Sequence, residues 1–253
     1  MRILITGLKG TLAPVLAEAA LCAGHHVLGW DRGRLPPGDA EFGRAFLDAG
    51  APDAIAHLAT GGEAWADWLA RWAADRRRPF VFTSSAMVFH HEPDGPHSPE
   101  DERTGQDDYG RSKIRCEDAV RAAHAGASVV RIGWQIDAAR AGNNMLMQLD
   151  ERQQREGVVA ASRAWKPACS FMRDTAQALL ALIETPQPGV VHLDSNADEG
   201  HGFDRIVAAL KRAFGRETWQ LRVHEDYRHD QRLAGGGARV PPLSDRLPLL
   251  RQG

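Results

Sequence analysis

The fold is decided near the start of the chain, where residues 2–13 read Arg-Ile-Leu-Ile-Thr-Gly-Leu-Lys-Gly-Thr-Leu-Ala. The apolar run that opens this stretch predicts a short buried strand, and the Ala-rich segment from Thr11 to Ala23 predicts a helix. Gly7, Gly10 and Ala13 lie between them in a G-x-x-G-x-x-A pattern. The first glycine permits a tight turn, and the second lets backbone approach a pyrophosphate at the helix N-terminus. Because glycines after strands are also common turn residues, the pattern alone does not decide the function.

Short apolar runs alternate with helical stretches along most of the chain. Runs without polar alternation are typical of parallel strands covered on both faces. The alternation predicts an α/β fold with a doubly wound parallel sheet, the Rossmann fold. The expected strands are residues 2–6, 26–30, 54–58, 80–83, 128–132, 158–160 and 190–193, and the expected helices are 11–23, 40–49, 63–77, 110–125, 142–156 and 173–184. Prolines and glycines at 35–38 leave no room for a full strand between Asp31 and residue 53.

Composition excludes several classes of partner. The 31 Lys and Arg residues nearly balance the 33 Asp and Glu residues, so neither nucleic acid nor an anionic membrane is expected, and a small molecule is. The cysteines at 22, 116 and 169 lack CxxC spacing, which argues against disulfides and metal and fits a reducing cytoplasm. No signal peptide or membrane span is visible, so we expect a soluble, unprocessed protein. The histidines at 57, 90, 91 and 97 lack ligand spacing, and we predict no metal site.

Asp31 strengthens the interpretation of the glycine pattern. It stands at the end of the second expected strand, 24 positions after Gly7, near the offset expected for a carboxylate that binds an adenosine ribose. This placement favours NAD over NADP. Arg32 and Arg34 follow directly and could neutralise a 2'-phosphate, so NADP stays an alternative, and both arginines could also be solvated loop residues.

Tyr109 and Lys113 are four residues apart, on one face of an expected helix. A cation beside a phenol stabilises the phenolate, so tyrosine becomes a usable general acid or base nearer neutral pH. Such pairs also occur by chance on helix surfaces. Ser85 follows an expected strand, at the end where open α/β sheets bind ligands. Its hydroxyl could donate to a substrate oxygen, although Ser84 and Ser85 could also cap a turn.

These motifs together resemble the extended short-chain dehydrogenase/reductases, of the NAD-dependent epimerase/dehydratase group that includes the dTDP-4-dehydrorhamnose reductases. The resemblance covers nearly the whole chain. Ala86 stands where dehydratases and many rhamnose-type reductases carry Asp, and no acidic pair follows Ser85. This departure weakens a dehydratase assignment and leaves reductase and epimerase open. The motifs that carry it are residues 6–13, 53–59, 84–89, 109–113 with Glu117, 130–132 and 173–176.

The resemblance implies an NAD(P)-dependent oxidoreductase or epimerase that acts on a nucleotide-activated sugar or a related keto or hydroxy compound. Ser85, Tyr109 and Lys113 would be catalytic, and Lys113 would also hold the nicotinamide ribose. The cofactor, NAD with NADP as the alternative, would contact Gly7, Leu8, Lys9, Gly10, Thr11, Asp31, Arg32, Leu58, Ala59, Thr60, Thr83, Tyr109 and Lys113. The alternative from another class is a non-catalytic NAD(P)-binding subunit with the same fold.

The resemblance also implies a division of the chain. Residues 1–135, with parts of 158–195, would form the NAD(P)-binding domain, and residues 136–157 and 196–253 a small C-terminal substrate lobe and tail. Ser85, Asn144 and Arg173 would contact substrate, although Asn144 and Arg173 could equally serve packing or a helix cap. Tryptophans at 65, 68 and 72 share one helix face, which indicates core or subunit interface. In the family that the chain resembles, this helix and the Tyr109 helix commonly form a dimeric four-helix bundle, so the resemblance implies a homodimer.

Overall fold

The computed structural model describes residues 1–236 and 239–251. Its contacts divide the chain into two compact units. Unit 1 comprises Met1–Val88, Gly105–Arg131 and Ala176–Val191, and unit 2 comprises Phe89–Thr104, Ile132–Thr175 and the chain from His192 onward. Residues 89–104 and 132–135, which the sequence analysis grouped with the first domain, therefore belong to unit 2.

Unit 1 is built on a six-stranded sheet with the order β10-β5-β4-β3-β1-β2. Strand β1 pairs in parallel with β2 and β3, and β3 pairs in parallel with β4. The doubly wound parallel sheet predicted from the sequence is confirmed. The strands are β1 (Arg2–Thr6), β2 (His26–Gly29), β3 (Ala54–His57), β4 (Phe80–Ser85), β5 (Ser128–Ile132) and β10 (Gly189–Leu193).

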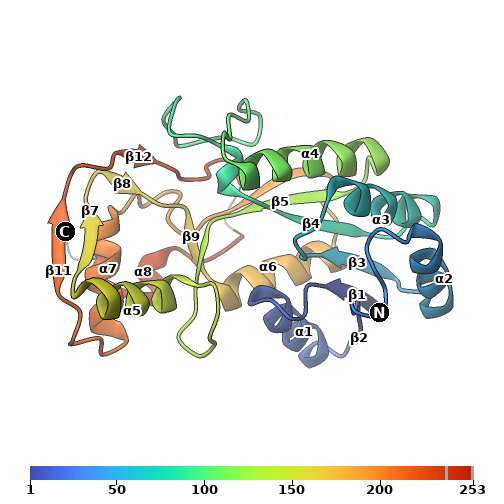
Figure 1. The fold of residues 1–253 in the computed structure, drawn as a ribbon, viewed down its shortest axis with the longest axis horizontal. Coiled ribbons are helices and arrows are strands. Elements are labelled where there is room, and N and C mark those ends of the chain that lie inside the picture. Colours follow the sequence, from blue (N-terminus) through green and yellow to red (C-terminus); the bar gives the residue numbers. More distant parts are fainter. Residues whose placement is uncertain (237–238, 252–253) are drawn as a thin grey trace. The chain divides into compact units, whose positions relative to one another are not determined.

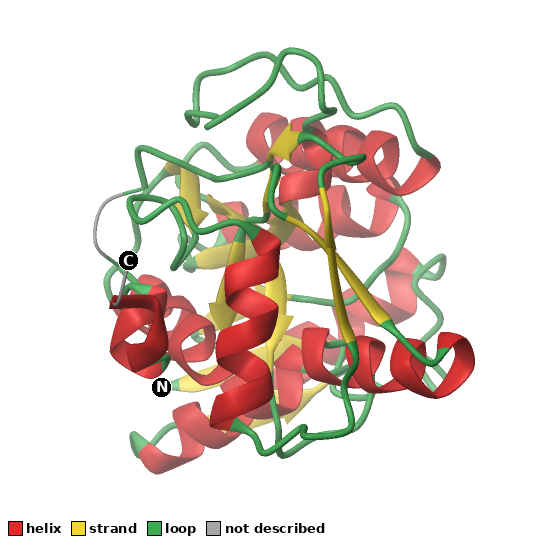
Figure 2. Cartoon of the chain, turned by 90° about the vertical axis from the view of Figure 1, so that its left-hand side faces the viewer, coloured by secondary structure: helices red, strands yellow, loops and turns green. Residues whose placement is uncertain are grey.

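Helices cover both faces of this sheet (Figures 1 and 2). In Figure 1, α3 and α4 lie along one face, and α1 and α6 along the other. The interval between Asp31 and β3 contains α2 and, among its described residues, no strand, as the Pro and Gly cluster predicted. Strand β2 forms one edge of the sheet. The elements are α1 (Leu12–Cys22), α2 (Ala40–Gly50), α3 (Glu63–Asp75), the 3-10 turn η1 (Ala86–Val88), α4 (Asp108–Ala123) and α6 (Met172–Glu184).

The tryptophans of α3 belong to the core of unit 1. Trp65, Trp68 and Trp72 are at most 6% exposed and join the cluster between the sheet, α2 and α4. Each of the last two also satisfies its indole N–H: Trp68 donates to the carbonyl of Pro37 at 3.2 Å, and Trp72 to Asp48 at 2.8 Å. Of the two alternatives for this face, core packing is therefore confirmed.

Unit 2 consists of short parallel strand pairs and helices around a second core. The pairs are β6 with β9, β7 with β11, and β8 with β12. The tail after Thr218 supplies β11 and β12 as well as buried leucines at 243, 247 and 250. The elements are β6 (Trp134–Ile136), α5 (Met145–Glu156), β7 (Val159–Ser162), β8 (Trp165–Lys166), β9 (Cys169–Phe171), α7 (Phe203–Ala213), β11 (Leu221–His224), β12 (His229–Asp230), α8 (Leu243–Arg246) and η2 (Pro248–Arg251).

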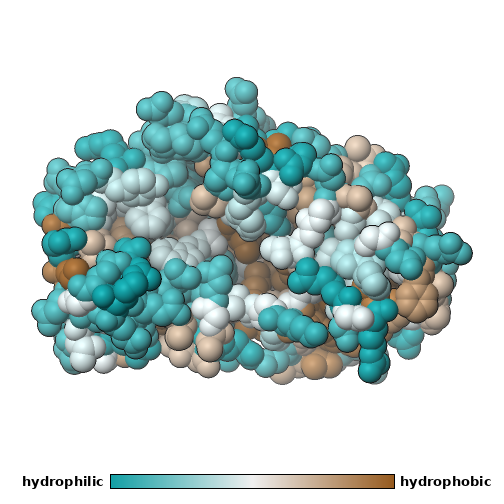
Figure 3. Space-filling view, in the orientation of Figure 1, coloured by the Kyte–Doolittle hydropathy of each residue, from teal (hydrophilic) through white to brown (hydrophobic). Residues whose placement is uncertain are grey.

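Hydrophilic residues cover most of the face shown in Figure 3. Within residues 1–236 and 239–251, no helix is long and apolar enough to cross a membrane. Cys22 is exposed, Cys116 and Cys169 are buried, and all three are free thiols.

Candidate active site

The three side chains predicted to be catalytic come from β4 and α4, which adjoin in unit 1. Ser85 is the last residue of β4, and Tyr109 and Lys113 occupy the first two turns of α4. Asp107 caps this helix by accepting a hydrogen bond from the backbone N–H of Gly110 at 2.8 Å. The Asp107 cap and the end of β4 thus place the three residues near one another, as the sequence predicted.

Gly110 allows α4 to begin close to the turn that follows β4. A Cβ at this position would lie 2.3 Å from the carbonyl oxygen of Met87. No ordinary side chain fits at that distance, so the residue after Tyr109 must be glycine for this packing. The contact brings the first turn of α4 against η1, and Tyr109 reaches a hydrogen bond with the Ser85 side chain.

Lys113 is buried, with 7% of its surface exposed. Its ammonium donates a hydrogen bond to the carbonyl of Thr83 at 2.9 Å and lies 5.8 Å from the centre of the Tyr109 ring. Lysine has three N–H donors, so this bond fixes the ammonium and leaves donors for a ligand. Burial lowers the pKa of Lys113, and the negative charges that Cys116 and Glu117 can carry act in the opposite direction.

The pKa of Tyr109 is raised from its ordinary value, not lowered as the sequence analysis expected. Partial burial of the phenol is the largest cause; the hydrogen bond with Ser85 lowers the pKa, and the negative charge of Asp107 raises it. Tyr109 is therefore protonated at neutral pH in this structure. A neutral phenol with a hydroxyl at its side is a proton donor.

Most of the residues predicted for the cofactor lie at the ends of β1, β2 and β3, which are neighbours in the sheet, and Thr83, Tyr109 and Lys113 lie on β4 and α4. Gly7 has φ +86°, and a Cβ there would lie 3.0 Å from the backbone nitrogen of Ala59. Gly10 closes the turn by donating its N–H to the carbonyl of Gly7 at 2.7 Å. The loop therefore offers bare backbone at the start of α1, which is the surface that a pyrophosphate needs.

Thr6 and His57 hold the segment that contains Leu58, Ala59 and Thr60. The Thr6 hydroxyl accepts hydrogen bonds from the N–H groups of Leu58 and Ala59 at 3.0 and 3.1 Å, and it lies 2.8 Å from Nδ1 of His57. Burial lowers the pKa of His57 to about 3, aided by the charges of Lys113 and Arg32, so the ring is neutral. A hydroxyl that accepts twice gives its own proton to Nδ1, and His57 thus carries its proton on Nε2.

Asp31 lies at the end of β2 with cations around it. Its carboxylate accepts the N–H of Gly33 at 3.0 Å and lies 3.5 Å from the ammonium of Lys9 and 4.0 Å from Arg34. The Gly33 hydrogen bond and then Lys9 hold the pKa of Asp31 below its ordinary value. Arg32 donates to the carbonyl of Thr60 at 3.0 Å. Both the carboxylate and the basic groups discussed for cofactor choice therefore lie at this strand end.

Two residues predicted to contact substrate lie in unit 2. Asn144 is fully buried and caps α5: its Oδ1 accepts from Met147 N–H at 3.2 Å, and its Nδ2 donates to the carbonyl of Arg140 at 2.9 Å. These contacts favour the helix-cap alternative. Arg173 is exposed in the first turn of α6, beside Asp174, which pairs with Arg246.

The roles of three groups were missed in the sequence. They are the Thr6–His57 pair, Gly110, and a buried ion pair between Glu117 of α4 and Arg131 of β5. Glu117 carried a signal, because it lies four residues after Lys113 on the same helix face. The other contacts join residues from different elements and depend on the fold.

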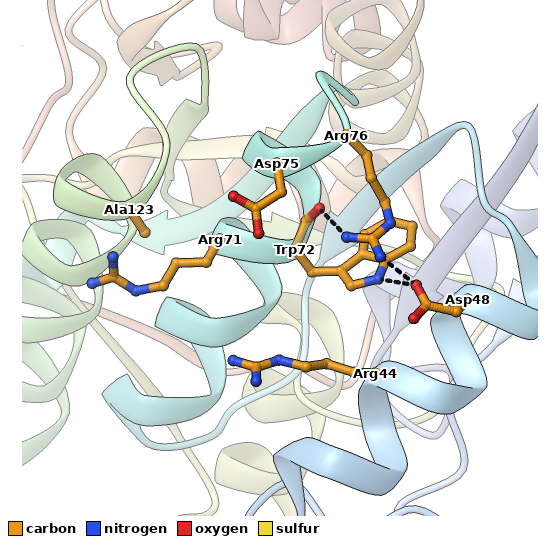
Figure 4. Close-up of a pocket in the computed structure, with 7 residues that line it drawn as sticks. All are labelled: Arg44, Asp48, Arg71, Trp72, Asp75, Arg76 and Ala123. Carbon is orange, nitrogen blue, oxygen red and sulfur yellow. Dashed lines mark hydrogen bonds and ion pairs between the residues drawn. The ribbon is translucent and has the colours of Figure 1, made fainter.

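One cavity, of about 380 Å³, is lined by residues of α2 and α3, by Arg76 and by Ala123 of α4 (Figure 4), and neither Ser85 nor Tyr109 lines it. Its charged walls are largely satisfied within the protein: Asp48 accepts hydrogen bonds from Trp72 and from Arg76, and Arg71 pairs with Asp67. Among residues 1–236 and 239–251, no cluster of His, Cys, Asp or Glu is arranged to hold a metal ion.

A doubly wound sheet with a glycine loop after β1, a serine at the end of β4 and a Tyr-x-x-x-Lys pair on the next helix defines an extended short-chain dehydrogenase/reductase. A family model, "RmlD substrate binding domain", matches residues 61–218, more than half of the chain. The chain belongs to this family.

Related proteins agree with this assignment. A dTDP-4-dehydrorhamnose reductase of Mycolicibacterium smegmatis is 27% identical over 246 residues, which cover 90% of this chain and 74% of the relative. The crystal structure of a dTDP-4-dehydrorhamnose reductase from Clostridium acetobutylicum superposes with a TM-score of 0.82 at 18% identity and covers 100% of both chains. The enzyme of that name from Bacillus anthracis, solved with NADP, also has a TM-score of 0.82, at 15% identity over 97% of this chain and 96% of that one. WbmH of Bordetella bronchiseptica, solved with NAD⁺, has a TM-score of 0.77 at 16% identity and covers 99% and 98%.

Proposed function

We propose that the chain is an NAD(P)-dependent oxidoreductase that transfers a hydride between the cofactor and a nucleotide-activated sugar. The observation that carries the proposal is the grouping of Ser85, Tyr109 and Lys113 where β4 ends and α4 begins. Family membership and the relatives named as dTDP-4-dehydrorhamnose reductases support a nucleotide sugar with a keto group as the substrate class.

The residues present fit the proposed cofactor. The positive φ of Gly7 and its close approach to Ala59 leave a cradle that a Cβ would fill. Gly7 to Thr11 would receive the pyrophosphate, and Asp31 with Arg32 the adenosine ribose. Leu58, Ala59, Thr60 and Thr83 would line the cofactor. The bound dinucleotide would supply or accept the hydride.

The catalytic residues would handle the proton. The Ser85 oxygen already accepts the N–H of Met87 at 3.1 Å, so its hydroxyl hydrogen can point to a substrate oxygen. Tyr109, protonated at neutral pH, would donate its proton to that oxygen during reduction and take it back during oxidation. Lys113, fixed by Thr83, would hold the nicotinamide ribose and stabilise the phenolate that remains.

We further propose NAD as the preferred cofactor, because the Asp31 carboxylate would bind ribose hydroxyls and repel a 2'-phosphate. Lys9 and Arg34 beside it keep NADP as the alternative. Fluorescence titration with NADH and NADPH measures the preference. Tighter binding of NADPH would overturn the role assigned to Asp31.

Turnover tests the proposal as a whole. The purified chain should oxidise NAD(P)H with a member of a nucleotide-keto-sugar panel, and Tyr109→Phe should lower kcat by about 10² to 10⁴-fold. Unchanged turnover in Tyr109→Phe would refute the catalytic assignment. A chain that binds NADH but turns over no member of the panel would support the alternative, a non-catalytic subunit with the same fold.

A further inference from the structure

The buried face of α4 carries two charged residues. Lys113 is 7% exposed and Glu117 is 0% exposed, and their four-residue spacing places them one turn apart on the same helix face. Arg131 of β5, which is 1% exposed, makes a bidentate contact with the Glu117 carboxylate. Its Nε donates to Oε1 at 3.0 Å, and its Nη2 donates to Oε2 at 2.8 Å. Lys113, Glu117 and Arg131 are thus two buried cations and one buried anion, and the anion is paired with Arg131.

Besides Glu117 and Arg131, three titratable groups near Lys113 are His57, Cys116 and Tyr109, and all three are neutral near neutral pH. His57 of β3 stays neutral because burial and the charge of Lys113 lower its pKa to about 3. Burial raises the pKa of the Cys116 thiol, and that of Tyr109 is also raised. Of the two groups whose negative charge raises the pKa of Lys113, first Cys116 and then Glu117, the thiol is protonated at neutral pH, so Glu117 is the one that carries the charge there.

We propose that Glu117 is a positioning residue whose carboxylate, fixed by Arg131, keeps Lys113 protonated beside Tyr109. A buried ammonium favours its neutral form unless an anion lies nearby. Burial lowers the pKa of Lys113, and the Glu117 carboxylate counteracts that shift. The inference rests on the proposed function for the use made of Lys113, whereas the protonation of Lys113 can be measured without any substrate.

If the ion pair were only structural, it would stabilise the packing of α4 on β5. Removing either partner of a buried ion pair destabilises a protein. Glu117→Gln and Arg131→Gln both break this ion pair, but the charges that remain have opposite signs. Glu117→Gln removes the buried carboxylate and keeps the Arg131 cation, whereas Arg131→Gln removes the cation and keeps the carboxylate. The two variants should therefore resemble each other in stability and differ in the protonation of Lys113.

The chain has four lysines, at positions 9, 113, 166 and 211, so the signal of each can be followed by NMR of isotope-labelled lysine side chains in the full chain. Lys113→Arg assigns the Lys113 signal. We expect Glu117→Gln to lower the titration midpoint of Lys113 by at least about one pH unit, and Arg131→Gln not to lower it. Asp118→Asn, which removes an exposed carboxylate at the next position of α4, should leave the midpoint unchanged.

The proposal would be overturned if the titration midpoint of Lys113 did not change in Glu117→Gln, or if it fell equally in Glu117→Gln and Arg131→Gln. If Glu117→Gln does not fold, Glu117→Asp and Arg131→Gln decide, because both keep the anion and a fall of one unit in either contradicts the role. In active enzyme, Glu117→Gln should move the alkaline limb of the kcat/KM profile to lower pH. If the midpoints behave as expected and turnover is absent, the proposed function fails while the role of Glu117 stands.

Discussion

At the scale of single residues, the candidate site depends on how Ser85, Tyr109 and Lys113 are held. Ser85 is anchored by the backbone N–H of Met87 in η1, and Lys113 by the backbone carbonyl of Thr83 in β4. Backbone anchors cost no side-chain freedom of their own, so the donor groups are positioned before a ligand arrives.

Ser85→Ala tests the role of the hydroxyl. Loss of a hydrogen-bond donor aimed at a reacting oxygen typically lowers kcat by about 10² to 10³-fold, and we expect a decrease of that size with cofactor affinity unchanged. Ser84→Ala is the matched control, because the Ser84 hydroxyl is buried in the same strand without a hydrogen-bond partner among the described residues. Equal losses of kcat in both variants would remove Ser85 from the mechanism.

The lowered pKa of Lys113 predicts a pH dependence of stability. Between the folded pKa and the ordinary value of about 10.4, the unfolded chain binds more protons at Lys113 than the folded chain does. The free energy of unfolding of the parent, relative to Lys113→Met, should therefore rise with pH in this window. Urea unfolding of both proteins at several alkaline pH values measures the difference, and a constant or falling difference would contradict the burial argument.

Local patterns at the residue scale were visible in the sequence. The four-residue spacing of Tyr109 and Lys113 and the serine at the end of β4 were enough to predict that the three side chains lie together. The contacts of Glu117 with Arg131 and of Thr6 with His57 join residues from different elements, so no local sequence pattern predicts these pairs. The capping contacts of Asn144 likewise depend on where the chain before α5 turns back, which spacing does not specify.

At the scale of elements, the contact between the start of α4 and η1 sets the site. Gly110 and Gly105 both approach the carbonyl of Met87 closely, and Gly105 donates its N–H to Val88 at 2.8 Å. The helix that carries Tyr109 and Lys113 is thereby fixed against the strand that carries Ser85. The alignment of the three groups follows from this packing and from the Asp107 cap.

Gly110→Ala should displace the first turn of α4, because its Cβ would collide with the Met87 carbonyl. A misplacement of about 1 Å can cost about 10²-fold in rate, so kcat should fall strongly. Gly62→Ala, at the N-cap of α3, is the control, since a Cβ there meets nothing within 4 Å and φ is −73°. Steady-state kinetics and thermal unfolding compare the two, and an active Gly110→Ala would show that this contact does not align the site.

The elements of unit 1 were predicted well because their strands are apolar runs bounded by turns. Strands β1 to β5 and the helices between them lie within a few residues of the expected positions. Strands β8 and β12 are two residues long and β11 lies in a polar tail, so neither period nor composition marks them. Pairing partners distant in sequence create these strands.

At the scale of the whole molecule, the tail is part of the second core and not an appendage. Leu243, Leu247 and Leu250 are at most 3% exposed and pack in the cluster that also contains α5 and α7 residues. The family match ends at residue 218, before this tail begins. The homodimer, the cytoplasmic location and the functional naming of the two units stay predictions, and light scattering would measure the first.

Leu247→Ala should destabilise the chain by about 2–5 kcal/mol, because it opens a cavity in the core of unit 2. Leu249→Ala, two positions later and only partly buried, should cost clearly less. Urea unfolding followed by tryptophan fluorescence compares the variants. If both variants lost little and equally in the free energy of unfolding, the tail would be shown to pack loosely in the core of unit 2.

Transfer of an isotopic label follows the proposed chemistry itself. NADH or NADPH that carries deuterium at the reactive carbon is incubated with the chain and a nucleotide-activated keto sugar, and the sugar product is analysed by mass spectrometry. We predict that the parent transfers the deuterium to the sugar carbon and that Tyr109→Phe does so far more slowly while still binding the cofactor. Cofactor binding without any label in the sugar, or equal transfer by Tyr109→Phe, would contradict the assignment of Ser85, Tyr109 and Lys113 as a hydride-transfer site.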